Sequence, residues 1–212
     1  MARVISGPFV GFSGTINGVT YYQINGVTYS KSKNRKSTKP RTVKQEANSS
    51  TIGMISTFMG PFEDFAMVGY QHVAKSKGWN PHNAMVSHIW TVLKGKGKNR
   101  RIDLKKLLVT QGNLARAKQN AVELTAEGLA FSWSKEVEPR KGHHTDQVIM
   151  LAYFPELGEV KSKIGGAERS VEKDFLSLDG IEKGYSAEIF ISFIANDHSD
   201  LANSIYLGHL NW

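Results

Sequence analysis

Hydrophobic and polar residues change their spacing along the chain, and the N-terminal part begins with strand-like patterns. Residues 8–30 contain two short repeats, Asn17-Gly18-Val19-Thr20-Tyr21-Tyr22 and Asn25-Gly26-Val27-Thr28-Tyr29-Ser30. Asn-Gly pairs favour tight hairpin turns because both residues tolerate positive φ, and the β-branched and aromatic residues after them favour strands. The pattern predicts a small antiparallel β-ribbon. Such a ribbon is marginally stable alone and must pack on another surface.

The segment after the ribbon has helical spacing. A first helix is expected from Thr42 to the residues before Pro61, because proline interrupts a helix. A second helix is expected over residues 62–75. A third is expected to begin at Asn80-Pro81, which form a good N-cap and first-turn pair.

Alternation replaces helical spacing in the C-terminal part of the chain. Short strands at a spacing of about ten residues, separated by Gly, Asp, Pro and Asn clusters, are typical of an immunoglobulin-like or fibronectin type III-like β-sandwich. The expected fold class is therefore α+β, with a β-ribbon and short helices over residues 1–112 and the sandwich over residues 113–212. The residues expected in the sandwich core are Phe131, Trp133, Ile149, Leu151, Ile189, Ile191 and Phe193.

Composition excludes several classes of protein. Hydrophobic residues make up 40% of the 212 residues, which is too many for a disordered chain. The absence of cysteine excludes disulfides, thiolate metal sites and cysteine nucleophiles, and it favours the fibronectin type III kind of sandwich. No apolar run approaches the roughly 20 residues of a membrane span, and the N-terminus lacks a secretory signal. We expect synthesis in a cytoplasm without a signal peptide, and no contact with membranes.

Charge is distributed unevenly between the two halves. Residues 1–110 contain 17 basic and 4 acidic residues, a net charge of +13, whereas residues 111–212 contain 10 and 15, a net charge of −5. Such asymmetry indicates that the basic half contacts a polyanion, an acidic lipid surface or an acidic neighbouring subunit. A second copy of this chain, with its acidic C-terminal half, is one such neighbouring subunit.

Two segments concentrate the positive charge. Residues 31–44 contain no acid, and their seven basic residues are Lys31, Lys33, Arg35, Lys36, Lys39, Arg41 and Lys44. Residues 94–106 form a second, glycine-containing basic segment, in which the candidate contact residues are Lys96, Lys98, Arg100 and Arg101. One interpretation is a solvated surface. The other is contact with phosphates or an acidic subunit, because clustered Lys and Arg without Glu lack internal pairing.

Residues with catalytic chemistry form no recognised constellation. Glu136 and Glu138 lie in an expected loop, and His143-His144 show no established metal-ligand spacing. The stretch Gly11-Phe12-Ser13-Gly14 lacks the correctly spaced second glycine of a G-x-S-x-G nucleophile elbow, and no helix is expected after it. We therefore expect no enzyme activity, no catalytic or metal-binding residues, no cofactor and no small-molecule substrate.

Four stretches together resemble an uncharacterised family of Bacteroidetes-type bacteria and their phages, whose domain has no known function. They are Gly11 to Gly18, Lys39 to Gln45, Ile102 to Leu114 and Asn203 to Gly208. The resemblance implies a basic N-terminal half of ribbon and helices and an immunoglobulin-like C-terminal domain. It implies no catalytic or ligand residues.

These observations favour a non-enzymatic structural protein, a component of a phage virion or phage-derived particle. Its N-terminal half is expected to contact identical subunits, forming a homo-oligomer, or other virion subunits. The alternative is an intracellular nucleic-acid-binding protein that uses residues 31–44 and 94–106. A surface adhesion or carbohydrate-binding module is a third interpretation, which the absence of a signal peptide disfavours.

Overall fold

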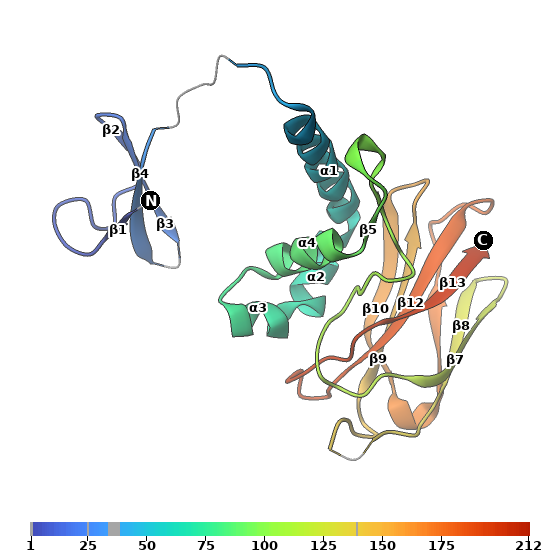
Figure 1. Ribbon diagram of the computed structural model, residues 1–212. Helices are drawn as coiled ribbons and strands as arrows, with labels where there is room; N and C mark the ends of the chain where they lie inside the picture. Colours follow the sequence, from blue (N-terminus) through green and yellow to red (C-terminus); the bar gives the residue numbers. More distant parts are fainter. Residues whose placement is uncertain (1, 25, 34–38, 139) are drawn as a thin grey trace. The chain divides into compact units, whose positions relative to one another are not determined.

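The computed structural model describes residues 2–24, 26–33, 39–138 and 140–212, and its class is α+β (Figure 1). The chain divides into two compact units, Met1–Thr42 and Val43–Trp212, here called unit 1 and unit 2. The boundary predicted between residues 112 and 113 falls inside unit 2. Helices and strands on its two sides share one hydrophobic core, which sequence spacing does not reveal.

Unit 1 is an antiparallel sheet with the strand order β1-β4-β3-β2. Its strands are β1 (Ala2–Val4), β2 (Gly14–Ile16), β3 (Val19–Ile24) and β4 (Val27–Ser32). The predicted ribbon corresponds to β2, β3 and β4, and β1 is an additional edge strand. Asn17 and Gly18 have φ values of 48° and 77°, which confirms the predicted first turn. Asn25, in the second Asn-Gly pair, lies outside the described residues.

The first part of unit 2 is helical. Its elements are α1 (Val43–Met59), η1 (Gly60–Phe62), α2 (Glu63–Gly69), α3 (Gln71–Lys77) and α4 (Pro81–Thr91). The cap predicted for the third helix is confirmed, since Asn80 Oδ1 accepts a hydrogen bond from the backbone of His82 at 2.8 Å. The second predicted helix is divided into α2 and α3 at Tyr70. This side chain is fully buried and donates a hydrogen bond from its hydroxyl to the carbonyl of Leu108 at 2.6 Å.

The second part of unit 2 contains two antiparallel sheets, one with the order β10-β9-β12-β13 and the other with the order β11-β8-β7. The strands are β7 (Lys118–Leu124), β8 (Gly128–Ser134), β9 (Gln147–Phe154), β10 (Glu159–Glu168), β11 (Lys173–Ser177), β12 (Ser186–Ile194) and β13 (Ile205–Asn211). A separate hairpin, β5 (Leu93–Lys94) and β6 (Arg101–Ile102), includes the turn η2 (Gly97–Asn99). A further turn, η3 (Arg169–Val171), precedes β11.

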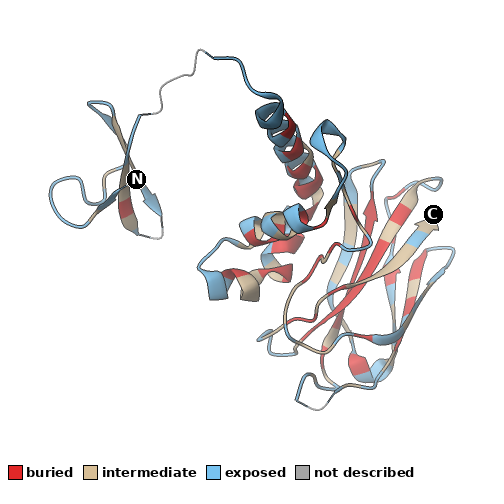
Figure 2. Ribbon diagram, in the orientation of Figure 1, coloured by how far each residue is buried: buried red, intermediate tan, exposed pale blue. Residues whose placement is uncertain are grey.

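Two hydrophobic cores lie on opposite faces of β9 and β12. Both strands are buried along most of their length (Figure 2). Phe131 and Trp133 of β8 pack with Phe193 of β12 in the core that the two sheets share. Ile149 and Leu151, predicted for that core, belong instead to the core formed with the helices, because alternate residues of a strand point to opposite faces. Coverage on both faces explains why residues 148–154 read as a continuous apolar run.

The segment from Leu107 to Leu114 connects the helices with the sheets and is held by hydrogen bonds to the end of the chain. Ser204 Oγ accepts a hydrogen bond from the backbone of Val109 at 2.8 Å, and the Asn203 side chain accepts one from Gly112 at 3.1 Å. A Cβ atom on Gly112 would lie 2.1 Å from the carbonyl oxygen of Leu201, so only glycine fits. Two of the four stretches that carry the family resemblance therefore meet here.

His88 makes the stability of unit 2 depend on pH. Its Nε2 accepts a hydrogen bond from the backbone of Leu108 at 3.0 Å, which requires the neutral ring, and burial lowers the pKa of His88 below the usual 6.5. Because the unfolded chain binds the proton more tightly, this contribution to stability is complete above pH 6.5 and is lost as the pH falls from 6.5 to the folded pKa. Melting temperatures between pH 5 and 8 should show this decrease. In His88→Gln, the amide oxygen of Gln still accepts the hydrogen bond from Leu108 but cannot be protonated, so the melting temperature should fall less between pH 8 and pH 5. An equal fall in the variant would show that other groups cause the pH dependence.

Candidate interaction surfaces

The first predicted contact segment, residues 31–44, begins with the last two residues of β4 and ends in the first turn of α1. Its described basic residues are all exposed: Lys31, Lys33, Lys39, Arg41 and Lys44. Arg35 and Lys36, which were predicted with them, lie outside the described residues. Lys31 Nζ is 5.6 Å from the centroid of the Tyr22 ring, a distance typical of a cation–π contact. The segment therefore begins with a positive charge beside an aromatic side chain.

The second predicted contact segment, residues 94–106, is partly used for internal packing. Lys98 Nζ is 3.1 Å from Glu46 Oε2, and Arg100 donates a hydrogen bond to Asn48 Oδ1 at 3.2 Å. The Arg100 guanidinium also lies 5.7 Å from the centroid of the Trp90 ring. These contacts attach the β5–β6 hairpin to α1 and α4.

An ion pair lies at the base of the same hairpin. Lys94 Nζ is 2.7 Å from the buried carboxylate of Asp103, and this hydrogen bond lowers the pKa of Asp103. Lys96 and Arg101 are exposed. Lys98 is exposed as well, but Lys98 and Arg100 each contact another part of unit 2.

One face of the unit 1 sheet is covered by residues 5–13. Phe9 stacks on Tyr21 with ring centroids 4.9 Å apart, and Phe12 contacts the same ring edge-on. The backbone N–H of Gly11 donates a hydrogen bond to Thr28 Oγ1 at 2.8 Å. We call this side the loop face. The loop itself carries exposed apolar side chains, with Ile5 84% exposed and Val10 52% exposed.

The opposite face of this sheet combines aromatic and cationic residues. In antiparallel strands, residues directly opposite each other share a face, and the register places Tyr22 opposite Tyr29 and Tyr29 opposite Arg3. Lys31, opposite Thr20, lies in the neighbouring row. The rings of Tyr22 and Tyr29 stack with centroids 5.9 Å apart at an interplanar angle of 23°. We call this side the tyrosine face, defined by Arg3, Tyr22, Tyr29 and Lys31.

Sequence spacing did not indicate the tyrosine face as a unit. The place of Arg3 beside Tyr29 was not predicted, because the strand that contains Arg3 pairs with a strand about 26 residues later in the chain. Tyr22 and Tyr29 follow successive Asn-Gly signals, which place them on paired strands. Their register was the missing information.

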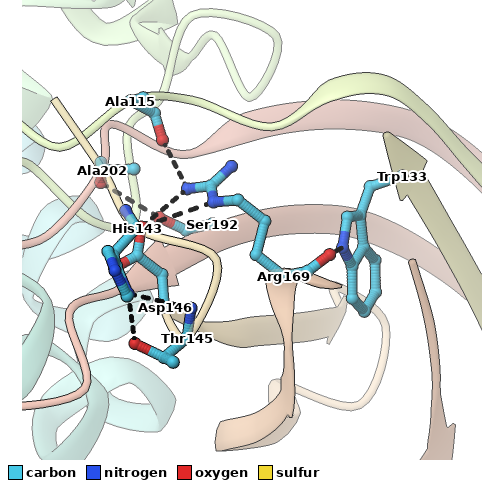
Figure 3. A network of polar contacts seen from close by, with 8 residues as sticks. All are labelled: Ala115, Trp133, His143, Thr145, Asp146, Arg169, Ser192 and Ala202. Carbon is cyan, nitrogen blue, oxygen red and sulfur yellow. Dashed lines mark hydrogen bonds and ion pairs between the residues drawn. The ribbon is translucent and has the colours of Figure 1, made fainter. Parts of the chain in front are cut away.

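A polar network lies inside unit 2 and includes the fully buried Arg169 (Figure 3). Its Nη2 donates hydrogen bonds to the carbonyl of Ala115 at 2.9 Å and to Asp146 Oδ2 at 3.3 Å. Burial lowers the pKa of Arg169, and the charge of Asp146 opposes that effect. The guanidinium lies 3.8 Å from the centroid of the Phe193 ring, and the carbonyl of Arg169 accepts a hydrogen bond from Trp133 Nε1 at 2.9 Å. The network cross-links the ends of several strands and is inaccessible to a partner.

The histidine pair that sequence analysis considered as a metal site belongs to the surface of this network. His143 and His144 have ring centroids 3.9 Å apart, and the His143 backbone donates a hydrogen bond to Asp146 at 2.8 Å. Across the described residues, no three His, Asp or Glu side chains are grouped closely enough to hold a metal ion. The loop therefore positions Asp146 beside Arg169.

A cavity of about 440 Å³ lies beside α1 and the hairpin of β9 and β10. Its lining is mainly apolar and includes Met54, Phe58, Ile102, Leu104 and Tyr153. Burial raises the pKa of Tyr153, so the phenol stays protonated at neutral pH. The lining presents no pair of acid and base groups.

None of the helices in the described part of the chain combines the length and the apolar composition needed to cross a membrane. Comparison with curated proteins and with solved structures gives no match. A family model described as "Family of unknown function (DUF6266)" matches residues 9–208. This range contains most of unit 1 and nearly all of unit 2, including all four stretches that carry the resemblance noted above. The chain therefore belongs to the DUF6266 family of unknown function.

Proposed function

We propose that this protein is a non-enzymatic structural component of an assembly, a virion or phage-derived particle, and that unit 1 makes the subunit contact. The observation that carries the proposal is the burial in unit 1. Among the described residues of this unit, only Thr28 is buried. Domains of about 40 residues rarely bury enough apolar surface to be stable without a disulfide, a metal or a partner, and this chain has no cysteine.

The loop face supplies apolar surface for such a contact. Ile5, Val10 and Ile16 are 84%, 52% and 40% exposed. Ile16 belongs to this face because it pairs with Val19, two residues before Tyr21 on β3. Exposed apolar side chains in so small a unit favour a surface that another subunit covers. Ile24, which is 50% exposed, adds one on the tyrosine face. The partner that we propose for this surface is a second copy of this chain. Other virion subunits would then bind to the resulting oligomer.

The rest of the chain supports a binding role through its fold. We propose that residues 113–212 form an immunoglobulin-like sandwich of the fibronectin type III kind. In chain order, the first, second and fifth strands form one sheet, and the third, fourth, sixth and seventh form the other. This division corresponds to the A-B-E and C′-C-F-G sheets of such sandwiches. The fold is common in structural and adhesive proteins, although it hosts many functions.

Sedimentation velocity of the full chain over a range of concentrations tests the assembly. We expect oligomers that persist at moderate salt, because the burial of apolar surface is not screened. Ile5→Ser combined with Val10→Ser should shift the equilibrium to the monomer. The control is Ile52→Ser, which changes a 58% exposed isoleucine on α1 of unit 2 and should leave the oligomers intact. A wild-type chain that is monomeric at every concentration would contradict the proposal.

The nucleic-acid alternative keeps one specific support. Residues 94–106, the second segment of that alternative, support it less, because Lys98 and Arg100 attach the β5–β6 hairpin to the helices. Its first segment begins on the tyrosine face, where aromatic and positive side chains are neighbours. That face is separate from the loop face that carries the assembly proposal.

A further inference from the structure

The tyrosine face has a chemistry that the assembly contact does not use. The register places Arg3, Tyr29 and Tyr22 in one row across three strands, with Lys31 in the next row. The opposite side of the sheet is occupied by Phe9, Phe12 and their loop, so the two sides have different surroundings. Two stacked rings between two cations are the combination that proteins present to unpaired nucleotides, whose bases stack on aromatic groups while their phosphates contact Lys and Arg.

The charge of unit 1 favours the same partner. Residues 1–42 contain seven basic residues and no acidic residue. An anionic strand therefore meets no repulsive side chain from this unit, and Lys33, directly after β4, adds a further exposed positive charge.

We propose that the tyrosine face binds single-stranded nucleic acid, with bases stacked on Tyr22 and Tyr29 and phosphates bound by Arg3 and Lys31. A duplex keeps its bases stacked inside the helix and would contact only the two cations. An acidic peptide would use the cations and leave the rings without a stacking partner. The aromatic pair is thus the feature that selects an unpaired strand. The site goes beyond the subunit contact proposed above, which lies on the loop face.

Fluorescence anisotropy of the full chain with a labelled oligothymidylate tests the site. Tyr22→Ala with Tyr29→Ala should weaken binding by roughly 30-fold or more, because two stacking contacts are lost. Tyr22→Phe with Tyr29→Phe should bind within about threefold of the wild type, because the phenyl rings still stack. The phenylalanine variant also distinguishes loss of stacking from loss of folding, since it keeps the rings that pack on the sheet.

The cations are tested by the salt dependence of the same measurement. Arg3→Gln with Lys31→Gln should reduce the slope of log affinity against log salt by about 1.4, the value for two phosphate contacts on a single strand. Lys75→Gln with Lys173→Gln is the matched control, because it removes two exposed cations of unit 2 that lie outside both predicted contact segments and should leave that slope unchanged. Ile5→Ser with Val10→Ser should likewise leave the affinity per chain unchanged, which separates this site from the assembly contact.

Three results would overturn the proposal. The first is the absence of oligonucleotide binding at low salt. The second is binding that the paired Tyr→Ala changes leave unaffected, or that is equally tight for a duplex of the same length. The third is competition by polyglutamate as effective as competition by unlabelled oligothymidylate at equal charge, which would assign the face to an acidic peptide.

Discussion

Asp146→Ala is expected to lower the free energy of unfolding of unit 2 by about 3–5 kcal/mol, because it leaves the buried Arg169 guanidinium without its counter-charge. Both residues are almost completely buried, and Nη1 of Arg169 already has no hydrogen-bond partner among the described residues. The change also removes the acceptor of the His143 backbone N–H. Denaturant unfolding followed by circular dichroism measures the loss.

Two comparisons make this result specific. Asp179→Ala removes an exposed aspartate from the same part of the chain and should change stability by about 0.5 kcal/mol or less. Asp146→Ala combined with Arg169→Met removes both charges and should be less destabilised than the sum of the two single variants. Additive losses would show that the two side chains act independently and would contradict the proposed pairing.

Trp133→Ala is expected to lower the free energy of unfolding by about 3–5 kcal/mol, which is a large fraction of the stability of a typical domain. The Trp133 ring is 4% exposed and contacts Phe193 edge-on at 5.5 Å. Its Nε1 also donates the hydrogen bond to the carbonyl of Arg169. The melting temperature and the denaturation midpoint measure the effect. The matched change is Trp79→Ala, because Trp79 is 47% exposed and its loss should cost about 1 kcal/mol or less. Equal losses for the two tryptophans would contradict the assigned burial.

Local signals predicted much of the secondary structure. The Asn17-Gly18 turn, the helix before Pro61 and the cap at Asn80 depend on residues that are close in the sequence, and the structure confirms them. Alternation located β8 and β12 for the same reason. The interruption at Tyr70 was not predicted, because it is set by a hydrogen bond to Leu108, which lies far along the chain.

Contacts between distant parts of the chain determine which core each face of a buried strand belongs to, and local spacing does not show them. Residues 148–154 were correctly predicted as a buried strand, but an apolar run does not say what covers each of its faces. Helices cover one face, so Ile149 and Leu151 lie in the helix-facing core and the compact unit begins at Val43.

The candidate surfaces show the same division between local and long-range information. Counting Lys and Arg located both basic segments. It did not show that Lys98 and Arg100 contact α1, since those contacts join residues about fifty positions apart. The tyrosine face depends on strand register, because a shift of one residue would move the side chains of a strand to the opposite side of the sheet. Arg3 joined the candidate residues only through its pairing with Tyr29.

The covering of β9 and β12 by helices on one side also affects how the chain is made. Helices α1 to α4 are complete at Thr91, but the strand face that buries their apolar residues includes β12, which ends at Ile194. At a synthesis rate of about 5–20 residues per second, the helices wait roughly 5–20 s for that strand. For the first part of this interval Phe62, buried in the finished protein, lacks Tyr153 of β9, on which its ring packs with centroids 5.0 Å apart. The helix-facing core of unit 2 is therefore completed only after β12 has been synthesised.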